Sequence, residues 1–440
     1  MTWMETVTEQ TYAREPAWSC GLSGAFLGAL GFESSSLLVH GSSGCGFAMR
    51  YGLSQHWKSF IPCPVTSLHE EDVIFGGSTL LEKAIERIEQ INPSDVLFLL
   101  TSCSAEIIGE DVKRAAEAAT PKYRKRIVAV DSGGASGNTF DGYNNFLLRL
   151  VDQLYPEVMA VSGAASDATP QIDVMGIIPY YDMFWRGDIK EIKRLCGSIG
   201  VEINSVISGA CSLQTVANAD KTRMTVSIGR HIGARALKRI RNRGGGTMEF
   251  AVAPVGFYYT KKFLMDIAKG LDVLSKAVEE RIEQEELAAR QVMLRGFDFA
   301  KVMFTSGRVA VIGEPSRTLG LTHFLINELG MRPVLVAFTG TVEDEELREL
   351  EGILAQRRNR AKVLVDQDGH TIRRWLFETK PNIVFGRSTD RVADMDKTVF
   401  ITWQFPATDR LVVYDKPFLG YKGISAIIDD VINGFSRLWY

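Results

Sequence analysis

The sequence has six cysteines in 440 residues, and no two of them form a Cys-x-x-Cys pair. Their spacing therefore excludes a zinc ribbon and a thioredoxin-like redox site. Two nucleotide-binding motifs are also absent, the Gly-x-Gly-x-x-Gly fingerprint and the Walker A sequence. We expect that this chain does not bind ATP itself. No histidine follows His370, so the end of the chain offers no imidazole ligand for a metal.

Long hydrophobic runs and excess positive charge are missing as well. No apolar run approaches the roughly 20 residues of a membrane-spanning helix. The N-terminal stretch MTWMETVTEQTYAREP is polar and acidic, whereas a signal peptide starts with basic residues and continues with apolar ones. A net charge of -3 gives no reason to expect nucleic acid as a partner. We therefore expect a cytoplasmic protein without a membrane partner, where free cysteines more often serve metal or redox chemistry.

The chain is too long for a single hydrophobic core, and its apolar content of 45% is typical of globular proteins. Short apolar runs alternate with amphipathic segments in three rounds. Such strand–helix–strand units predict parallel sheets flanked by helices. We predict an α/β protein with three Rossmann-like domains, at residues 1–165, 166–300 (including a connecting helix) and 301–440.

The elements of these rounds follow from apolar periodicity and from Gly, Pro, Asn and Asp breaks. Residues 1–19 are expected to form a loose arm, and the small-residue stretch 162–170 a linker. We expect helices at 21–30, 81–90, 110–119, 188–197, 265–289 and 319–329. We expect strands at 36–39, 96–100, 127–130, 172–178, 201–207, 308–312, 333–337, 362–365 and 382–385.

Three cysteines lie where a regular element is expected to begin or end. Cys20 precedes a small-residue helix, Cys45 follows the Gly-Ser turn in VHGSSGCGFAMR, and Cys103 follows the apolar run Val96–Leu100. Loops at such positions can bring their residues together at one site. Three thiols are too few for a complete four-thiolate site. Two interpretations remain open, small buried core thiols or ligands of an iron–sulfur or redox centre.

The other cysteines and two of the histidines have weaker signals. Cys63 lies between two prolines and Cys196 at an apolar position of a helix, so both are expected to be structural. Cys211 follows a predicted strand and is the only other candidate ligand. His56 and His69 have polar or charged neighbours, and we expect both to be exposed.

A dense set of motifs lies between Cys20 and Asp111, comprising SCGLSGA, VHGSSGCG, LSQHWK, HEED, IFGG and TSCSAEIIGED. Farther along the chain are MGIIPYYDMFWRGDIKEIKRL, APVGFYYTKKFL, and FPATDR followed by PFLGYKGI. Together they resemble the nitrogenase component 1 family of oxidoreductases. The resemblance is to the β-type subunit, which does not carry the catalytic cofactor, and the spacing from Cys20 to Cys45 fits that type.

This resemblance implies a role for each of the three cysteines. Cys20, Cys45 and Cys103 match the thiolates that a β-type subunit gives to an iron–sulfur cluster of the 8Fe–7S P-cluster type. An α-type partner supplies the remaining thiolates in an α2β2 heterotetramer, which explains the odd number. The resemblance further implies an ATP-dependent homodimeric iron–sulfur reductase as electron donor, and an electron-relay role for this chain.

Two absences favour the β-type assignment. The resemblance places the cofactor thiolate of an α-type subunit in the stretch MTVSIGRH, around Ile228, and this stretch contains no cysteine. The cofactor histidine of the third domain is missing too. The resemblance therefore implies that the substrate-reducing site lies in the partner subunit.

The segment Asp131–Tyr143, DSGGASGNTFDGY, departs from the family's pattern. Nitrogenase β subunits have a His-Thr-Pro-x-Phe segment here, with a serine near the relay cluster. Alignment places Gly134 at that serine, and Ser132 and Ser136 are nearby. The departure favours a nitrogenase-like relative, of which methylthio-alkane reductase, which cleaves carbon–sulfur bonds for sulfur salvage, matches best. A dinitrogen-reducing nitrogenase and a cofactor-assembly scaffold are the alternatives.

Overall fold

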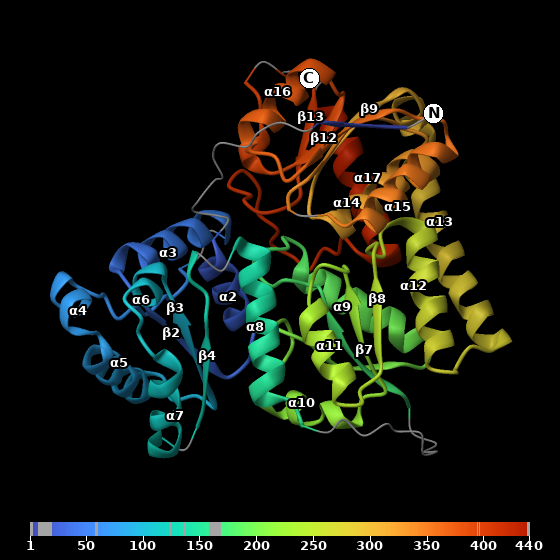
Figure 1. Ribbon diagram of the computed structural model, residues 1–440. Coiled ribbons are helices and arrows are strands. Elements are labelled where there is room, and N and C mark those ends of the chain that lie inside the picture. Colours follow the sequence, from blue (N-terminus) through green and yellow to red (C-terminus); the bar gives the residue numbers. More distant parts are fainter. Residues whose placement is uncertain are drawn as a thin grey trace.

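The computed structural model describes residues 3–7, 20–57, 60–123, 125–134, 137–157, 169–340, 342–393, 395 and 397–437, without the side chains of 295–303 and 306. Its strands form three sheets in which every pair is parallel, with helices on the faces (Figure 1). The predicted α/β class is therefore confirmed. None of the helices in these ranges is both long and apolar enough to cross a membrane.

The first sheet has the order β2-β3-β4 and is covered by helices on both faces. Successive side chains of its strands alternate between two cores. Leu37 and Val39 pack with α2 and α8, whereas Leu38 packs with α5 and α7. The elements are β2 (Ser35–His40), β3 (Val96–Thr101), β4 (Arg126–Val130), α2 (Gly21–Leu30), α3 (Ser43–Trp57), α4 (Glu70–Phe75), α5 (Ser78–Ile91), α6 (Cys103–Ile107), α7 (Val112–Tyr123) and α8 (Thr139–Leu154).

The second sheet has the order β6-β5-β7-β8 and lies beside α8 (Figure 1). Its hydrophobic core continues into the cores of both neighbours, so the three sheets are packed as one body. The elements are β5 (Gln171–Met175), β6 (Glu202–Val206), β7 (Met224–Ile228), β8 (Thr247–Phe250), α9 (Trp185–Ser198), α10 (Leu213–Ala217), α11 (Ala234–Asn242), α12 (Gly256–Gly270) and α13 (Lys276–Ser306).

The third sheet has six strands in the order β1-β11-β10-β9-β12-β13. Both ends of the chain lie in this part of the molecule (Figure 1). The elements are β1 (Met4–Val7), β9 (Arg308–Gly313), β10 (Arg332–Phe338), β11 (Ala361–Val365), β12 (Ile383–Gly386), β13 (Val399–Thr402), α14 (Pro315–His323), a π-helical turn (Phe324–Glu328), α15 (Asp344–Gln356), α16 (Gly369–Thr379) and α17 (Gly420–Ser436).

Two of the expected structural elements are wrong. Part of the expected loose arm, Met4–Val7, forms β1, which pairs with β11 at the edge of the third sheet. The expected helix over 265–289 is two helices, because α12 ends at Gly270 and α13 begins at Lys276, where the Ser275 side chain accepts a hydrogen bond from the backbone. Residues 8–19 of the arm and 162–168 of the expected linker lie outside the described residues.

Buried charges connect the second and third sheets. The guanidinium of Arg317, on α14, contacts the carboxylates of Asp182 at 2.7 Å and Asp188 at 3.0 Å. Asp188 also accepts hydrogen bonds from the backbone N–H groups of Phe418 and Leu419, just before α17. All of these groups are buried, so the contacts satisfy polar atoms that would otherwise be costly to remove from water.

A second buried ion pair lies beside the first. His231, after β7, has Nε2 2.9 Å from a carboxylate oxygen of Glu314 and Nδ1 3.5 Å from one of Glu346. Burial disfavours the charged imidazolium, but the attraction of the two carboxylates outweighs it and raises the pKa of His231 to about 9. Glu346 is on α15, so this histidine connects the second sheet to two helices of the third.

This pair predicts a pH-dependent stability. The folded-state pKa of His231 lies above its ordinary value of 6.5, so its contribution is complete below about pH 6.5 and is lost as the pH rises through about 9. Wild type should exceed a His231→Gln variant in free energy of unfolding by up to about 3 kcal/mol at neutral pH, and by much less at about pH 9.5. Chemical denaturation at both pH values measures this, and an unchanged difference would contradict the assignment.

Candidate functional site

Two of the three cysteines follow neighbouring strands. β2 and β3 pair in register along their whole length, so they end side by side. The loops that follow remain in contact, since a Cβ added at Gly41 would lie 2.0 Å from Oγ of Ser102. Cys45 is in the first turn of α3 and Cys103 is the first residue of α6. Both thiols therefore lie at the carboxyl edge of the first sheet.

Cys20 reaches the same edge through the packing of α2 on α8. It is the residue immediately before α2, whose first turn crosses the first turn of α8 closely enough to require glycine on both helices. A Cβ at Gly24 would lie 1.8 Å from the carbonyl oxygen of Thr139, and one at Gly142 would lie 1.8 Å from that of Gly21. Because α8 follows β4, this contact places Cys20 beside the segment that leaves the third strand.

The segment after β4 touches Cys103 directly. The backbone N–H of Gly134 donates to Sγ of Cys103 at 2.9 Å, and a Cβ at this glycine would lie 2.9 Å from the same sulfur. The hydroxyl of Ser132 donates instead to the carbonyl oxygen of Thr101 at 2.8 Å and is buried. Ser136 lies outside the described residues.

The three thiols share an edge without enclosing a metal ion by themselves. Cys103 is exposed, and Cys20 and Cys45 are partly exposed. Within the part of the chain that the structure describes, no group of three or more His, Cys, Asp and Glu side chains could hold a metal ion. Thiolates are the ligands that iron–sulfur clusters prefer. The donor set therefore fits one side of such a cluster.

Large apolar side chains are exposed on the helices that carry or flank these thiols. Phe47 and Tyr51 on α3 stack with ring centroids 5.7 Å apart, and both are more than half exposed. Phe75, which ends α4, is 86% exposed, and Ile107, which ends α6, is 82% exposed. Exposed apolar surface of this kind commonly marks a protein contact.

Of the remaining cysteines, two belong to the interior and one, Cys63, is partly exposed. Cys196 and Cys211 are fully buried, as expected for Cys196, and burial raises the pKa of each thiol to about 12. Burial also raises the pKa of Cys63 to about 12, although Arg50 opposes the shift. These three thiols therefore stay protonated at neutral pH in this chain, unlike a metal-bound thiolate.

One of the two histidines expected to be exposed is buried instead. His69 is exposed, but His56 packs against Phe405, and its Nδ1 accepts a hydrogen bond from the backbone N–H of Ala407 at 2.9 Å. The burial comes from a segment about 350 positions away in the sequence, which the polar neighbours of His56 do not indicate.

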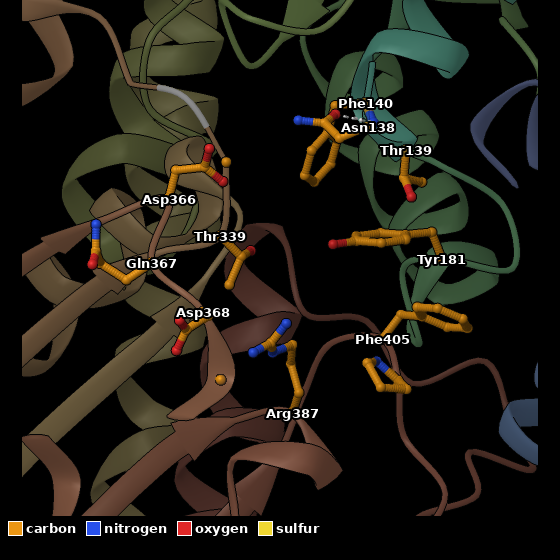
Figure 2. Close-up of a pocket in the computed structure, with 13 residues that line it drawn as sticks. Asn138, Thr139, Phe140, Tyr181, Thr339, Asp366, Gln367, Asp368, Arg387 and Phe405 are labelled. Atoms are coloured by element: carbon orange, nitrogen blue, oxygen red, sulfur yellow. Dashed lines mark hydrogen bonds between the residues drawn. The ribbon is translucent and has the colours of Figure 1, made fainter. Parts of the chain in front are cut away.

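A separate cavity of about 90 Å³, hereafter the central cavity, is lined by segments that follow or flank strands of all three sheets. It lies outside the carboxyl ends of β10, β11 and β12, a usual position for ligands in parallel sheets. Figure 2 shows the hydroxyl of Tyr181 and the guanidinium of Arg387 directed into it. Its lining includes no cysteine and no histidine, and comprises Asn138, Thr139, Phe140, Tyr181, Thr339, Gly340, Asp366, Gln367, Asp368, Gly369, Arg387, Phe405 and Pro406. Sequence reasoning missed this cavity because its walls come from widely separated segments.

Comparisons with known proteins identify the family and the fold of the chain. The family model "Nitrogenase component 1 type Oxidoreductase" matches residues 20–436. The nitrogenase molybdenum-iron protein beta chain of Methanococcus maripaludis is 27% identical, over 98% of this chain and 96% of that protein. The nitrogenase vanadium-iron protein beta chain of Trichormus variabilis is 23% identical, with the same coverage of 98% and 96%. The solved structure "Nitrogenase Cp1 at pH 6.5" has the same fold, with a TM-score of 0.82, 22% identity, and coverage of 98% and 95%.

Proposed function

Because the chain belongs to the family of nitrogenase component 1 type oxidoreductases, we propose that its cysteines hold an iron–sulfur cluster jointly with an α-type partner. Cys20, Cys45 and Cys103 each supply one thiolate. The observation that carries the proposal is their placement at one exposed edge of the first sheet. When bound, a cluster of the 8Fe–7S type stores electrons and passes them on.

The chain acts as the electron-relay subunit of a two-component reductase. Its exposed apolar side chains beside the thiols, including Phe47 and Ile107, pack against other subunits of an α2β2 assembly and its ATP-dependent iron–sulfur reductase. Substrate is reduced at a cofactor in the α-type partner. This division is supported by the central cavity of the present chain, whose lining has neither a thiol nor an imidazole to ligate a cofactor.

The substrate that we propose is a methylthio-alkane, which the complex cleaves reductively at a carbon–sulfur bond. The supporting observation is Gly134, whose backbone N–H lies 2.9 Å from Sγ of Cys103. A serine at this position offers a hydroxyl beside the thiolate as an extra ligand on oxidation, and glycine offers none. Carbon–sulfur cleavage makes a smaller demand on the relay than dinitrogen reduction and tolerates that loss.

Dinitrogen reduction is the second candidate. It is favoured by the similarity over nearly the whole chain to relatives named as nitrogenase beta chains. The third candidate function is that of a cofactor-assembly scaffold. A scaffold requires the same fold and similar thiolates as a reductase subunit, but it transfers a cofactor to another protein and does not turn over a substrate.

A substitution at Cys45 tests the cluster. A Cys45→Ala complex should lose most of its iron and its cluster signal, because each soft ligand removed leaves an iron site open. The matched control is Cys63→Ala, which removes a neighbouring thiol of raised pKa and should retain both. Iron analysis and electron paramagnetic resonance of the purified complexes measure this. Full iron and an unchanged signal in Cys45→Ala refute the assignment.

The substrate is tested with the reconstituted complex, its reductase and ATP. Methylthio-ethanol and dimethyl sulfide are offered beside dinitrogen, and thiol, hydrocarbon and ammonia are followed together. We expect thiol and hydrocarbon as the main products over many turnovers. Ammonia without thiol would assign the protein to dinitrogen reduction. Transfer of a cofactor to another apoprotein, with no turnover of any substrate, would assign it to the scaffolds.

A further inference from the structure

Glu106, on α6, connects the ends of two neighbouring strands. One oxygen of its carboxylate, Oε1, accepts a hydrogen bond from Oγ1 of Thr101 at 2.5 Å and another from the backbone N–H of Gly133 at 2.7 Å. Thr101 is the last residue of β3, and Gly133 lies in the segment that follows β4. A single side chain thus fixes the distance between the two loops at the carboxyl edge of the sheet.

Ser132 adds two further bonds between the same loops. Its backbone N–H donates to Oγ1 of Thr101 at 2.9 Å, and its hydroxyl donates to the carbonyl oxygen of Thr101 at 2.8 Å. Thr101 and Ser132 are both buried, so water does not compete for these contacts. Together with the carboxylate of Glu106 they hold residues 131–134 against the start of α6.

The segment held in this way ends at the thiol. The backbone N–H of Gly134 donates to Sγ of Cys103 at 2.9 Å. Two consecutive glycines permit the approach, because a Cβ at Gly133 would lie 2.2 Å from the carboxylate of Glu106 and one at Gly134 would lie 2.9 Å from the sulfur. The carboxylate of Glu106 therefore positions the backbone at Gly133. That backbone in turn positions the N–H of Gly134 against the sulfur of Cys103.

An amide N–H that donates to a thiolate stabilises negative charge on the sulfur. It therefore favours the reduced state of a cluster bound by that thiolate and raises the reduction potential. We propose that Glu106 is a positioning residue that sets the Gly134–Cys103 hydrogen bond and thereby keeps the potential of the cluster high. The inference rests on the proposed function, since it requires a cluster at Cys103.

Two variants of the complex with the α-type partner separate positioning from charge. Glu106→Ala and Glu106→Gln both remove the negative charge of the carboxylate, so its direct effect on the potential is the same in both. Only glutamine keeps a carbonyl oxygen that can accept from Thr101 and Gly133. We expect a more negative midpoint potential in the Ala variant than in the Gln variant, measured by a redox titration followed by electron paramagnetic resonance.

Amide hydrogen exchange gives a readout that does not involve the cluster. Residues 131–134 should exchange faster in Glu106→Ala than in Glu106→Gln, because only the first variant releases the segment. If the Ala variant does not assemble, Gly133→Ala provides a second test. It displaces the segment without changing any charge, and it should lower the midpoint potential relative to wild type.

The outcomes distinguish this inference from the proposed function. Equal potentials and equal exchange in the Ala and Gln variants, with iron retained, would overturn the role of Glu106 alone. A wild-type complex without iron would overturn the proposed cluster instead. The exchange rates would then still decide whether Glu106 holds the segment.

Discussion

The in-register parallel pairing of β2 with β3 is the contact on which the site depends. These strands are almost completely buried, and alternate side chains fill two different cores. A slip of one residue in the register would turn every side chain to the opposite face of the sheet, so each set of apolar side chains would point toward the other core. The register therefore fixes where both strands end, and with it the positions of Cys45 and Cys103. The position of the third cysteine, Cys20, depends on a different contact, the close crossing of α2 and α8.

Glycine makes these close approaches possible and also leaves the site open. Gly24 and Gly142 allow two helices to meet backbone to backbone, while Gly133 and Gly134 bring an amide to a thiol. The resulting edge has three cysteine thiols, exposed apolar neighbours and no metal site of its own in the described residues. The apolar core beneath this edge comes from β2–β4 and their helices. Under the proposed function, a second subunit covers this edge and completes the site.

The sequence predicts those parts of this arrangement that depend on local patterns of residues. Continuous apolar runs such as Val96–Leu100 predict buried parallel strands, and the Gly-Ser turn before Cys45 predicts that a new segment starts at this thiol. Features that arise from distant contacts were not predictable. β1 is a four-residue edge strand that pairs with β11, which begins at Ala361, far along the chain. Glu106 accepts a hydrogen bond from Gly133, which lies in a different loop. The same holds for the burial of His56 and for the central cavity, whose walls come from widely separated segments.

The central claim, that this chain holds half of a cluster site, is tested most directly by iron content with and without a partner. The chain is purified anaerobically alone and after co-expression with an α-type partner, and iron per chain is measured with the cluster signal. We expect little iron and no cluster signal in the chain alone, because three thiolates leave the cluster incomplete, and a full complement in the complex. A full and equal iron content in both preparations would contradict the account.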